Sequence, residues 1–166
     1  MARVFIHRLS PDDVDEAYVL ARLGNAGLTL KAWRVRAAAR NSRPTAGGVL
    51  LARDHEARPR GLAVYALTDP PDGRRTVQIE SLVGFDVLDP QSVAAALVAE
   101  VVRLARAEGC ETLCLMQPLG PSVEVAAQVL ASGVAVLPSL FWSPPPLGRP
   151  TLMLDPDSTR RPRRVQ

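Results

Sequence analysis

The middle of the chain changes from strand-like to helix-like patterning, and this change most constrains the fold. Three strand-like runs come first, at residues 47–52, 61–67 and 76–85. The polar segment DHEARPR separates the first two, and TDPPDGRR, with its Pro-Pro and Asp-Gly turn signals, separates the second pair. Short polar connections of this kind join antiparallel strands, so the runs predict an antiparallel meander.

A long amphipathic helix follows the meander. It opens at residues 89–92 (DPQS) and ends at Gly109. Its apolar positions recur every three or four residues, at Val93, Leu97, Val101 and Leu104. A short apolar strand is predicted next, at residues 112–116. A strand–helix–strand unit of this length most often makes a parallel crossover.

The flanking segments complete the order of elements. A strand is predicted at residues 3–9 and a helix from Ser10, the N-cap, with Pro11 at its first position. A second helix is expected over 29–39. The apolar positions expected on these two helices are Val14, Ala17, Val19, Leu20 and Leu23, then Leu30, Trp33, Val35 and Ala37. After residue 116 a helix is expected at 121–130 and strands at 139–142 and 151–154.

The resulting order is β-α-α-β-β-β-α-β-α-β-β. It indicates an α/β fold of the α+β kind, in which a mostly antiparallel sheet contains one parallel crossover. The chain has 166 residues, of which 47% are hydrophobic, and this suits one core. We therefore predict a single domain over 1–155 and a flexible, arginine-rich tail over 156–166.

Composition excludes several kinds of site. The two cysteines, Cys110 and Cys114, lack the spacing of a redox pair or a zinc half-site, which favours buried free thiols in a reducing compartment. His7 and His55 are far apart and have no ligand-like neighbours, so no metal site is predicted. The absence of a long apolar run or signal-peptide core favours a cytoplasmic protein without a membrane span.

The charged residues indicate the base composition of the genome more than they indicate a binding partner. The formal net charge is +3, and Lys31 is the sole lysine beside many arginines, a bias typical of a GC-rich bacterial genome. Several arginines fall in the tail, at 160–164, and the rest of the chain is close to neutral. Nucleic acid is therefore not the expected partner.

The order of elements resembles that of the GCN5-related N-acetyltransferase (GNAT) superfamily over residues 3–154. The resemblance implies helices on both faces of the sheet and a loop, Q/R-x-x-G-x-G/A, whose amides wrap the pyrophosphate of acetyl-CoA at the start of the long helix. The end of that helix, RLARAEG, aligns this loop with residues 89–94. The implied cofactor-binding residues are Leu82, Gly84, Gln91, Ser92, Val93, Ala94 and Ala95.

Asp89, Pro90 and Val129 depart from the family pattern. Asp89 stands where Gln or Arg is usual, and its carboxylate would repel a pyrophosphate, although it also suits the start of a helix. Pro90 removes one donor amide from the loop. Val129 aligns with the tyrosine that returns a proton to the leaving thiolate, and valine cannot donate one.

Glu80 is the candidate catalytic residue. The resemblance implies a carboxylate on this strand as the general base for the amine. A glutamate inside an apolar strand otherwise faces solvent or pairs with an arginine, and both alternatives stay open. Strand alternation predicts that Glu80 and Ser81 face opposite sides of the sheet, so that only one faces the cleft.

The resemblance also implies an acceptor pocket that is lined by the second helix and the loop before it and is capped by the strand expected at 139–142. The implied pocket residues are Gly27, Trp33 and Trp142, with core packing as the alternative for the two tryptophans. Phe141 and Trp142 are also candidates for a homodimer contact.

Two functions follow from the sequence. The first is an N-acyltransferase that moves an acetyl group from acetyl-CoA to a small-molecule or peptide amine. The alternative is a GNAT-shaped module without catalysis that binds a ligand or another protein.

Overall fold

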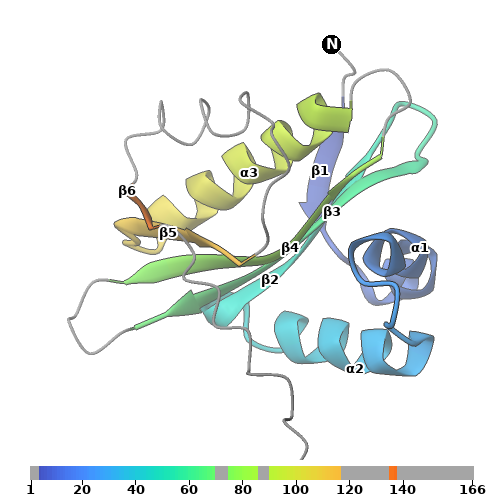
Figure 1. Ribbon diagram of the computed structural model, residues 1–166, viewed down its shortest axis with the longest axis horizontal. Coiled ribbons are helices and arrows are strands. Elements are labelled where there is room, and N and C mark those ends of the chain that lie inside the picture. Colours follow the sequence, from blue (N-terminus) through green and yellow to red (C-terminus); the bar gives the residue numbers. More distant parts are fainter. Residues whose placement is uncertain (1–3, 70–74, 86–89, 117–134, 138–166) are drawn as a thin grey trace, which may run out of the picture.

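The computed structural model describes residues 4–69, 75–85, 90–116 and 135–137, and these form a six-stranded sheet with helices on both faces (Figure 1). The strands lie side by side in chain order, β1-β2-β3-β4-β5-β6. Their bounds are Phe5–Arg8 (β1), Gly47–Arg53 (β2), Pro59–Thr68 (β3), Thr76–Gly84 (β4), Thr112–Leu115 (β5) and Ala135–Leu137 (β6). Pairing is antiparallel from β1 to β4 and parallel from β4 to β6.

The helices divide between the two faces of the sheet. The long helix α3 (Pro90–Ala107) covers one face, and α1 (Val14–Gly24) and α2 (Leu30–Asn41) cover the other (Figure 1). A 3₁₀ turn, η1 (Pro11–Asp13), leads into α1, and another, η2 (Pro44–Ala46), joins α2 to β2.

Local sequence sets where these helices begin and end. The Ser10 hydroxyl accepts the Asp13 amide at the start of η1, and the Thr29 hydroxyl accepts the Ala32 amide at the start of α2. Past the end of α3, Gly109 takes a φ of 76°, a left-handed conformation that glycine adopts without steric cost.

Each face has its own apolar core. Under α3, inward side chains of β2, β3 and β4 meet one stripe of the helix; the main members are Leu50, Tyr65, Val77, Ile79, Val93, Leu97 and Val101. Under α1 and α2, the opposite side chains of the same strands meet both helices; the main members are Val49, Leu51, Leu62, Val64, Leu20 and Trp33. The strand residues are buried on both faces, which explains their continuous apolar runs.

The structure confirms the predicted meander and crossover, and it corrects three core positions. Val19, Leu23 and Val35 were expected on apolar helix faces, but their exposed fractions are 66%, 60% and 65%. Each lies on the solvent side of a helix whose small residues, such as Ala17 and Ala37, contact the sheet instead.

The end of the sheet also differs from the prediction. β6 lies ahead of the strand expected at 139–142, and it adds a second parallel pair to the one expected. The elements predicted at 121–130, 139–142 and 151–154, and the tail at 156–166, lie outside the described residues.

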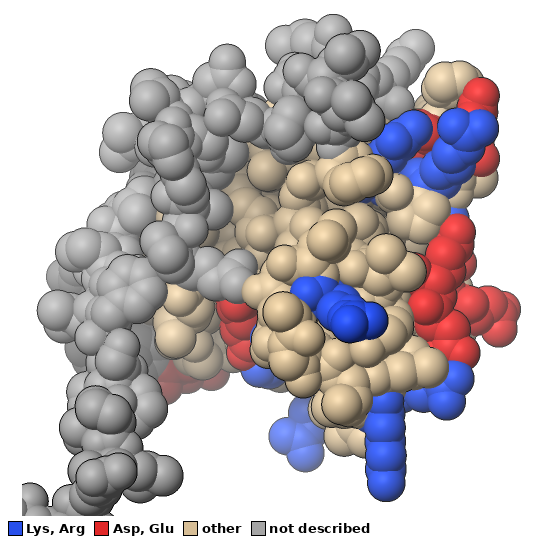
Figure 2. All heavy atoms as spheres, turned by 45° about the vertical axis from the view of Figure 1, so that its right-hand side comes forward, with Lys and Arg blue, Asp and Glu red and all other residues tan. Residues whose placement is uncertain are grey.

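The surface on the α1 side carries few charges at its centre. Figure 2 turns this side forward and shows mainly residues other than Lys, Arg, Asp and Glu across its middle, around a basic side chain, with further charged side chains along its right and lower edges. In the described part of the chain, no helix combines the length and apolar character needed to cross a membrane.

Candidate functional site

The pairing between the parallel strands β4 and β5 ends partway along β4. They pair from Thr76 with Thr112 to Ile79 with Leu115, and the Met116 amide then donates to the Ile79 carbonyl at 2.9 Å. β4 continues to Gly84, and among the described residues this second half pairs only with β3. The described pairing of β4 with β5 thus ends at the residue before Glu80.

A β-bulge lies where the pairing of β4 with β5 ends. Val64 of β3 lies opposite Ser81, and the next residue, Tyr65, lies opposite Ile79, so Glu80 has no partner across the ladder. An extra residue of this kind bends the strand and redirects side chains.

The bulge overturns the predicted alternation of Glu80 and Ser81. Glu80 bonds to α2, and Ser81 lies beside Gly24 at the end of α1, where an added Cβ would be 3.0 Å from the Ser81 Oγ. Both side chains therefore face the α1/α2 side. Alternation was expected because a regular strand turns successive side chains to opposite faces, and the bulge breaks that rule here.

Two arginines hold the Glu80 carboxylate. Arg36 donates to Oε2 at 3.1 Å, and Arg40 makes a short contact with Oε1. The two arginines are four residues apart and so lie on one side of α2. The side chains of Glu80 and of each arginine are 20% and 33% exposed, so water reaches the cluster. Of the two alternatives for Glu80, the structure shows the arginine partner.

Gln78 and Cys114 lie on the same face of the sheet as Glu80. They are neighbours across β4 and β5, and the residues on either side of them, such as Ile79 and Leu113, point into the α3 core. Burial raises the pKa of the Cys114 thiol, so the thiol stays protonated and is a poor nucleophile at neutral pH.

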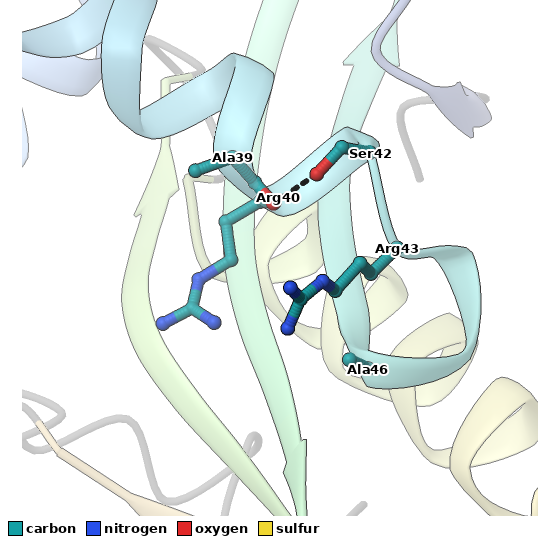
Figure 3. Close-up of a pocket in the computed structure, with 5 residues that line it drawn as sticks. All are labelled: Ala39, Arg40, Ser42, Arg43 and Ala46. Carbon is teal, nitrogen blue, oxygen red and sulfur yellow. Dashed lines mark hydrogen bonds between the residues drawn. The ribbon is translucent and has the colours of Figure 1, made fainter.

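A cavity of roughly 300 Å³ adjoins the cluster where α2 ends. The side chains of Arg40 and Arg43 border it, and Figure 3 shows both guanidinium groups on the same side of the last turn of α2. Ala39, Ser42 and Ala46 complete its lining.

The start of α3 packs closely on the end of β4. Gly61 and Gly84 lie opposite each other on β3 and β4. A Cβ added at Gly61 would be 2.6 Å from the Val93 Cγ1 and 2.9 Å from the Val83 carbonyl oxygen. Glycine at 61 therefore allows the first turns of α3 to lie directly against the sheet.

This packing brings the predicted cofactor residues together. Leu82 and Gly84 are on β4 beside the start of α3, and Ser92, Ala94 and Ala95 are half-buried on the first turns of the helix. Val93 is fully buried in the core, so only its backbone is available to a ligand. α3 begins at Pro90, which has no amide hydrogen, and Gln91 follows it in the first turn. Asp89 lies outside the described residues.

The predicted acceptor-pocket residues are not gathered at one place. Gly27 is exposed in the turn between α1 and α2, where its amide donates to the Asn25 side chain at 3.1 Å. Trp33 has no exposed surface, and its indole donates to the Val14 carbonyl at 2.7 Å, so it belongs to the core. Trp142 and Val129 lie outside the described residues.

Sequence reasoning missed the partners of Glu80. The signal was present: α2 contains arginines at 36 and 40 and no acidic residue, and a glutamate interrupts the apolar run of β4. The relative placement of α2 and β4 was needed to join them. No cluster of histidine, cysteine or acidic side chains suited to a metal occurs within the described ranges.

Comparison with known proteins gives one consistent result. No protein-family model matches the chain, and no curated protein matches its sequence. Solved structures do match it. Glucosamine-6-phosphate N-acetyltransferase from Arabidopsis thaliana has a TM-score of 0.63 at 13% identity, over 76% of this chain and 90% of that one.

Two further structures agree. The aminoglycoside acetyltransferase AAC(6')-Iy, in complex with a bisubstrate analogue of CoA, has a TM-score of 0.65 at 15% identity, over 80% of this chain and 90% of that one. Ribosomal-protein-alanine N-acetyltransferase from Brucella melitensis has a TM-score of 0.60 at 18% identity, over 81% of this chain and 94% of that one. With its bulged sheet and these structural matches, the chain has the fold of the GNAT acetyltransferases.

Proposed function

We propose that the protein is an N-acyltransferase that moves an acetyl group from acetyl-CoA to an amine. The observation that carries the proposal is the bulged Glu80, which follows directly on the last residue of β4 that pairs with β5. The GNAT fold supports it, because the structures it matches are named as N-acetyltransferases of different amines. Fold alone does not assign chemistry, so the argument rests on the site.

Glu80 is proposed to accept the proton of the attacking amine. A carboxylate offers about four lone-pair positions, and the two arginines use one on each oxygen, which leaves room for an amine N–H. The amine nitrogen attacks the thioester carbonyl carbon, the carbon–sulfur bond breaks, and the amine proton passes to Glu80. The departing thiolate takes a proton from solvent. Arg36 and Arg40 fix the orientation of the carboxylate.

The start of α3 and the end of β4 are proposed to hold the CoA moiety. The first-turn amides of a helix point outward and favour an anion, which suits the diphosphate of CoA at residues 91–95. Leu82 and Gly84 would offer backbone groups to the pantetheine arm. Pro90 contributes no N–H, so this helix start has one donor fewer than the general pattern. A cytoplasmic location and a small-molecule or peptide acceptor complete the proposal.

Thermal unfolding in the presence of acetyl-CoA tests the donor site. Ligand binding to the folded state raises Tm through mass action, so millimolar acetyl-CoA should raise it measurably. No shift would contradict the proposal. Glu80→Gln should keep the Tm shift and lower acetyl transfer about 100-fold or more, whereas Asp15→Asn, at an exposed carboxylate that also pairs with an arginine, should leave transfer unchanged.

A binding module without catalysis is the second candidate. The observation that favours it is the double ion pair, because a carboxylate held by two guanidinium groups also serves as a link between α2 and the sheet. If acetyl-CoA raises Tm but no amine in a broad panel releases CoA, this second function is the correct one.

A further inference from the structure

The cavity at the end of α2 carries more positive charge than its surroundings neutralise. Arg36 and Arg40 share a single carboxylate, that of Glu80. Arg43 has no ion pair or side-chain hydrogen bond within the described part of the chain, and its guanidinium borders the cavity together with that of Arg40 (Figure 3). Among these three arginines, two share one carboxylate and the third has none.

The elements around the cavity supply no further acid. α2 contains no aspartate or glutamate, and neither does the segment from Ser42 to Gly47 that includes η2. Arg75 reaches the Thr45 carbonyl of this segment at 3.3 Å, but it also pairs with Asp69 and Glu108. Arg8 also reaches this segment, at the Pro44 carbonyl, and has no carboxylate partner among the described residues. The positive charge that borders the cavity is therefore that of Arg40 and Arg43, with Arg8 nearby.

Two of the carbonyl groups at the end of α2 already accept hydrogen bonds from Ser42. The Ser42 amide donates to the Ala38 carbonyl, and the Ser42 hydroxyl donates to the Ala39 carbonyl, both at 2.9 Å. The macrodipole places about half an elementary negative charge at this end of the helix, which is less than the charge of Arg43 alone. Small side chains, Ala39 and Ala46, leave the space between the two guanidinium groups open.

We infer that this cavity binds the anionic group of the acceptor, so that the substrate is an amine that also carries a carboxylate or a phosphate. Planar guanidinium groups bind both oxyanions through paired N–H donors. Arg40 contacts Glu80 and also lines the cavity, so an anion held there would place the rest of the same molecule next to Glu80. That the acceptor is an amine rests on the proposed function. That it carries an anionic group rests on the cavity alone.

Matched pairs of acceptors test the inference through activity. Ethanolamine and phosphoethanolamine differ by a phosphate, and propylamine and β-alanine differ by a carboxylate. With acetyl-CoA as donor, we expect kcat/KM to be at least about tenfold higher for one acidic member than for its neutral partner, since a charge-assisted hydrogen bond has about that effect. Preference for the phosphate or carboxylate pair identifies the oxyanion. Equal rates within both pairs would overturn the inference.

Arg43→Gln links that preference to the cavity. The ratio of kcat/KM for the acidic acceptor to that for its neutral partner should fall about tenfold in this variant. Lys31→Gln removes the same charge from the exposed start of the same helix and should leave the ratio unchanged. A ratio that is unchanged in Arg43→Gln, or that falls equally in Lys31→Gln, would contradict the assignment.

A binding experiment separates this inference from the proposed function. At constant ionic strength, inorganic phosphate and phosphoethanolamine should each raise the Tm of the wild type and of Lys31→Gln, and should raise that of Arg43→Gln much less. An Arg43-dependent shift without CoA release from any amine would retain the anion site and refute acyl transfer. Equal shifts in all three proteins would refute the anion site, whatever the activity.

Discussion

The two faces of the sheet are built from the same strands, but one face is covered by an apolar core and the other also holds a polar cluster. On the α3 face, the buried polar group is the Tyr65 hydroxyl, which accepts from Arg8 at 3.0 Å, and one helix covers a continuous apolar core. On the other face, α1 and α2 leave room for a half-buried carboxylate and two guanidinium groups. The single long helix covers an apolar core, and the pair of shorter helices leaves a place where charged groups stay in contact with water.

Gly61→Ala should destabilise the packing of α3 on the sheet more than the other changes described below destabilise the fold. The new methyl group would contact Val93, Leu97 and the Val83 carbonyl within 3.0 Å, so α3 would have to move away from the sheet. We expect a loss of about 2–3 kcal/mol in the free energy of unfolding, measured by urea denaturation. Gly27→Ala is the control, because an added Cβ there meets nothing closer than 3.6 Å. Equal stability of the two variants would contradict the close packing of α3.

A double-mutant cycle on Arg40 and Glu80 should measure the polar cluster of the other face. We expect a coupling energy of about 1–2 kcal/mol, between the values typical of exposed and of buried pairs, because both side chains keep partial contact with water. The variants are Arg40→Met, Glu80→Gln and the double variant, followed by urea denaturation.

The matched control is the exposed pair of Arg34 and Asp15, whose side chains are 55% and 57% exposed. Its coupling energy should stay below about 0.5 kcal/mol. If the two cycles give the same value, the Glu80 cluster is no more buried in solution than a surface ion pair, and the contrast between the faces is smaller than the structure indicates.

Acid titration should show a second polar cluster on the α1/α2 side, at η1. The Ser10 hydroxyl holds the pKa of Asp13 below its ordinary value of 3.8, and His7 and Arg53 act in the same direction while burial opposes them. Because the pKa of Asp13 is lower in the folded protein than in the unfolded chain, its ionised carboxylate stabilises the fold at pH values above the unfolded pKa. This stabilisation is lost as the pH falls through the folded pKa.

The stability of the wild type should therefore fall below about pH 4 more steeply than that of Asp13→Asn, as followed by Tm against pH. Asp12→Asn, at an exposed neighbour in the same turn, should follow the wild-type curve. A curve for Asp13→Asn that is parallel to the wild type would show that the carboxylate contributes nothing to folding.

The smallest effect is expected outside both faces, in the β2–β3 hairpin. Ala57 has a φ of 61°, a left-handed conformation that is unfavourable for a residue with a Cβ. Ala57→Gly should raise the free energy of unfolding by about 0.5 kcal/mol, the balance of relieved strain and added chain entropy. Ala38→Gly, on the exposed side of α2, should lower it by about 1 kcal/mol. A loss of stability in both variants would contradict the left-handed turn.

The elements were more predictable from the sequence than their arrangement. Turn residues and periodicity located every helix and strand up to residue 116 to within a few positions, because those signals are local. Val19, Leu23 and Val35 were misplaced because periodicity identifies an apolar stripe but not the direction in which the helix is turned.

The site depended on long-range contacts. Glu80 stood out as a glutamate in an apolar strand, but its arginines come from α2 and its bulge from the register with β3. Neither relationship has a signal in a short window of sequence. The short parallel strand at Ala135–Leu137 was missed because three residues are too few to show a periodic pattern.

The bulge has a consequence for insertions and deletions in this chain. Ile79 faces α3, Ser81 faces α1, and their partners, Tyr65 and Val64, are already adjacent on β3. Loss of the single codon for Glu80 would therefore restore a regular ladder without moving any other side chain to the wrong face. A one-residue deletion usually disrupts the pairing of a central strand. Here it would leave a more regular strand and would also remove the candidate base.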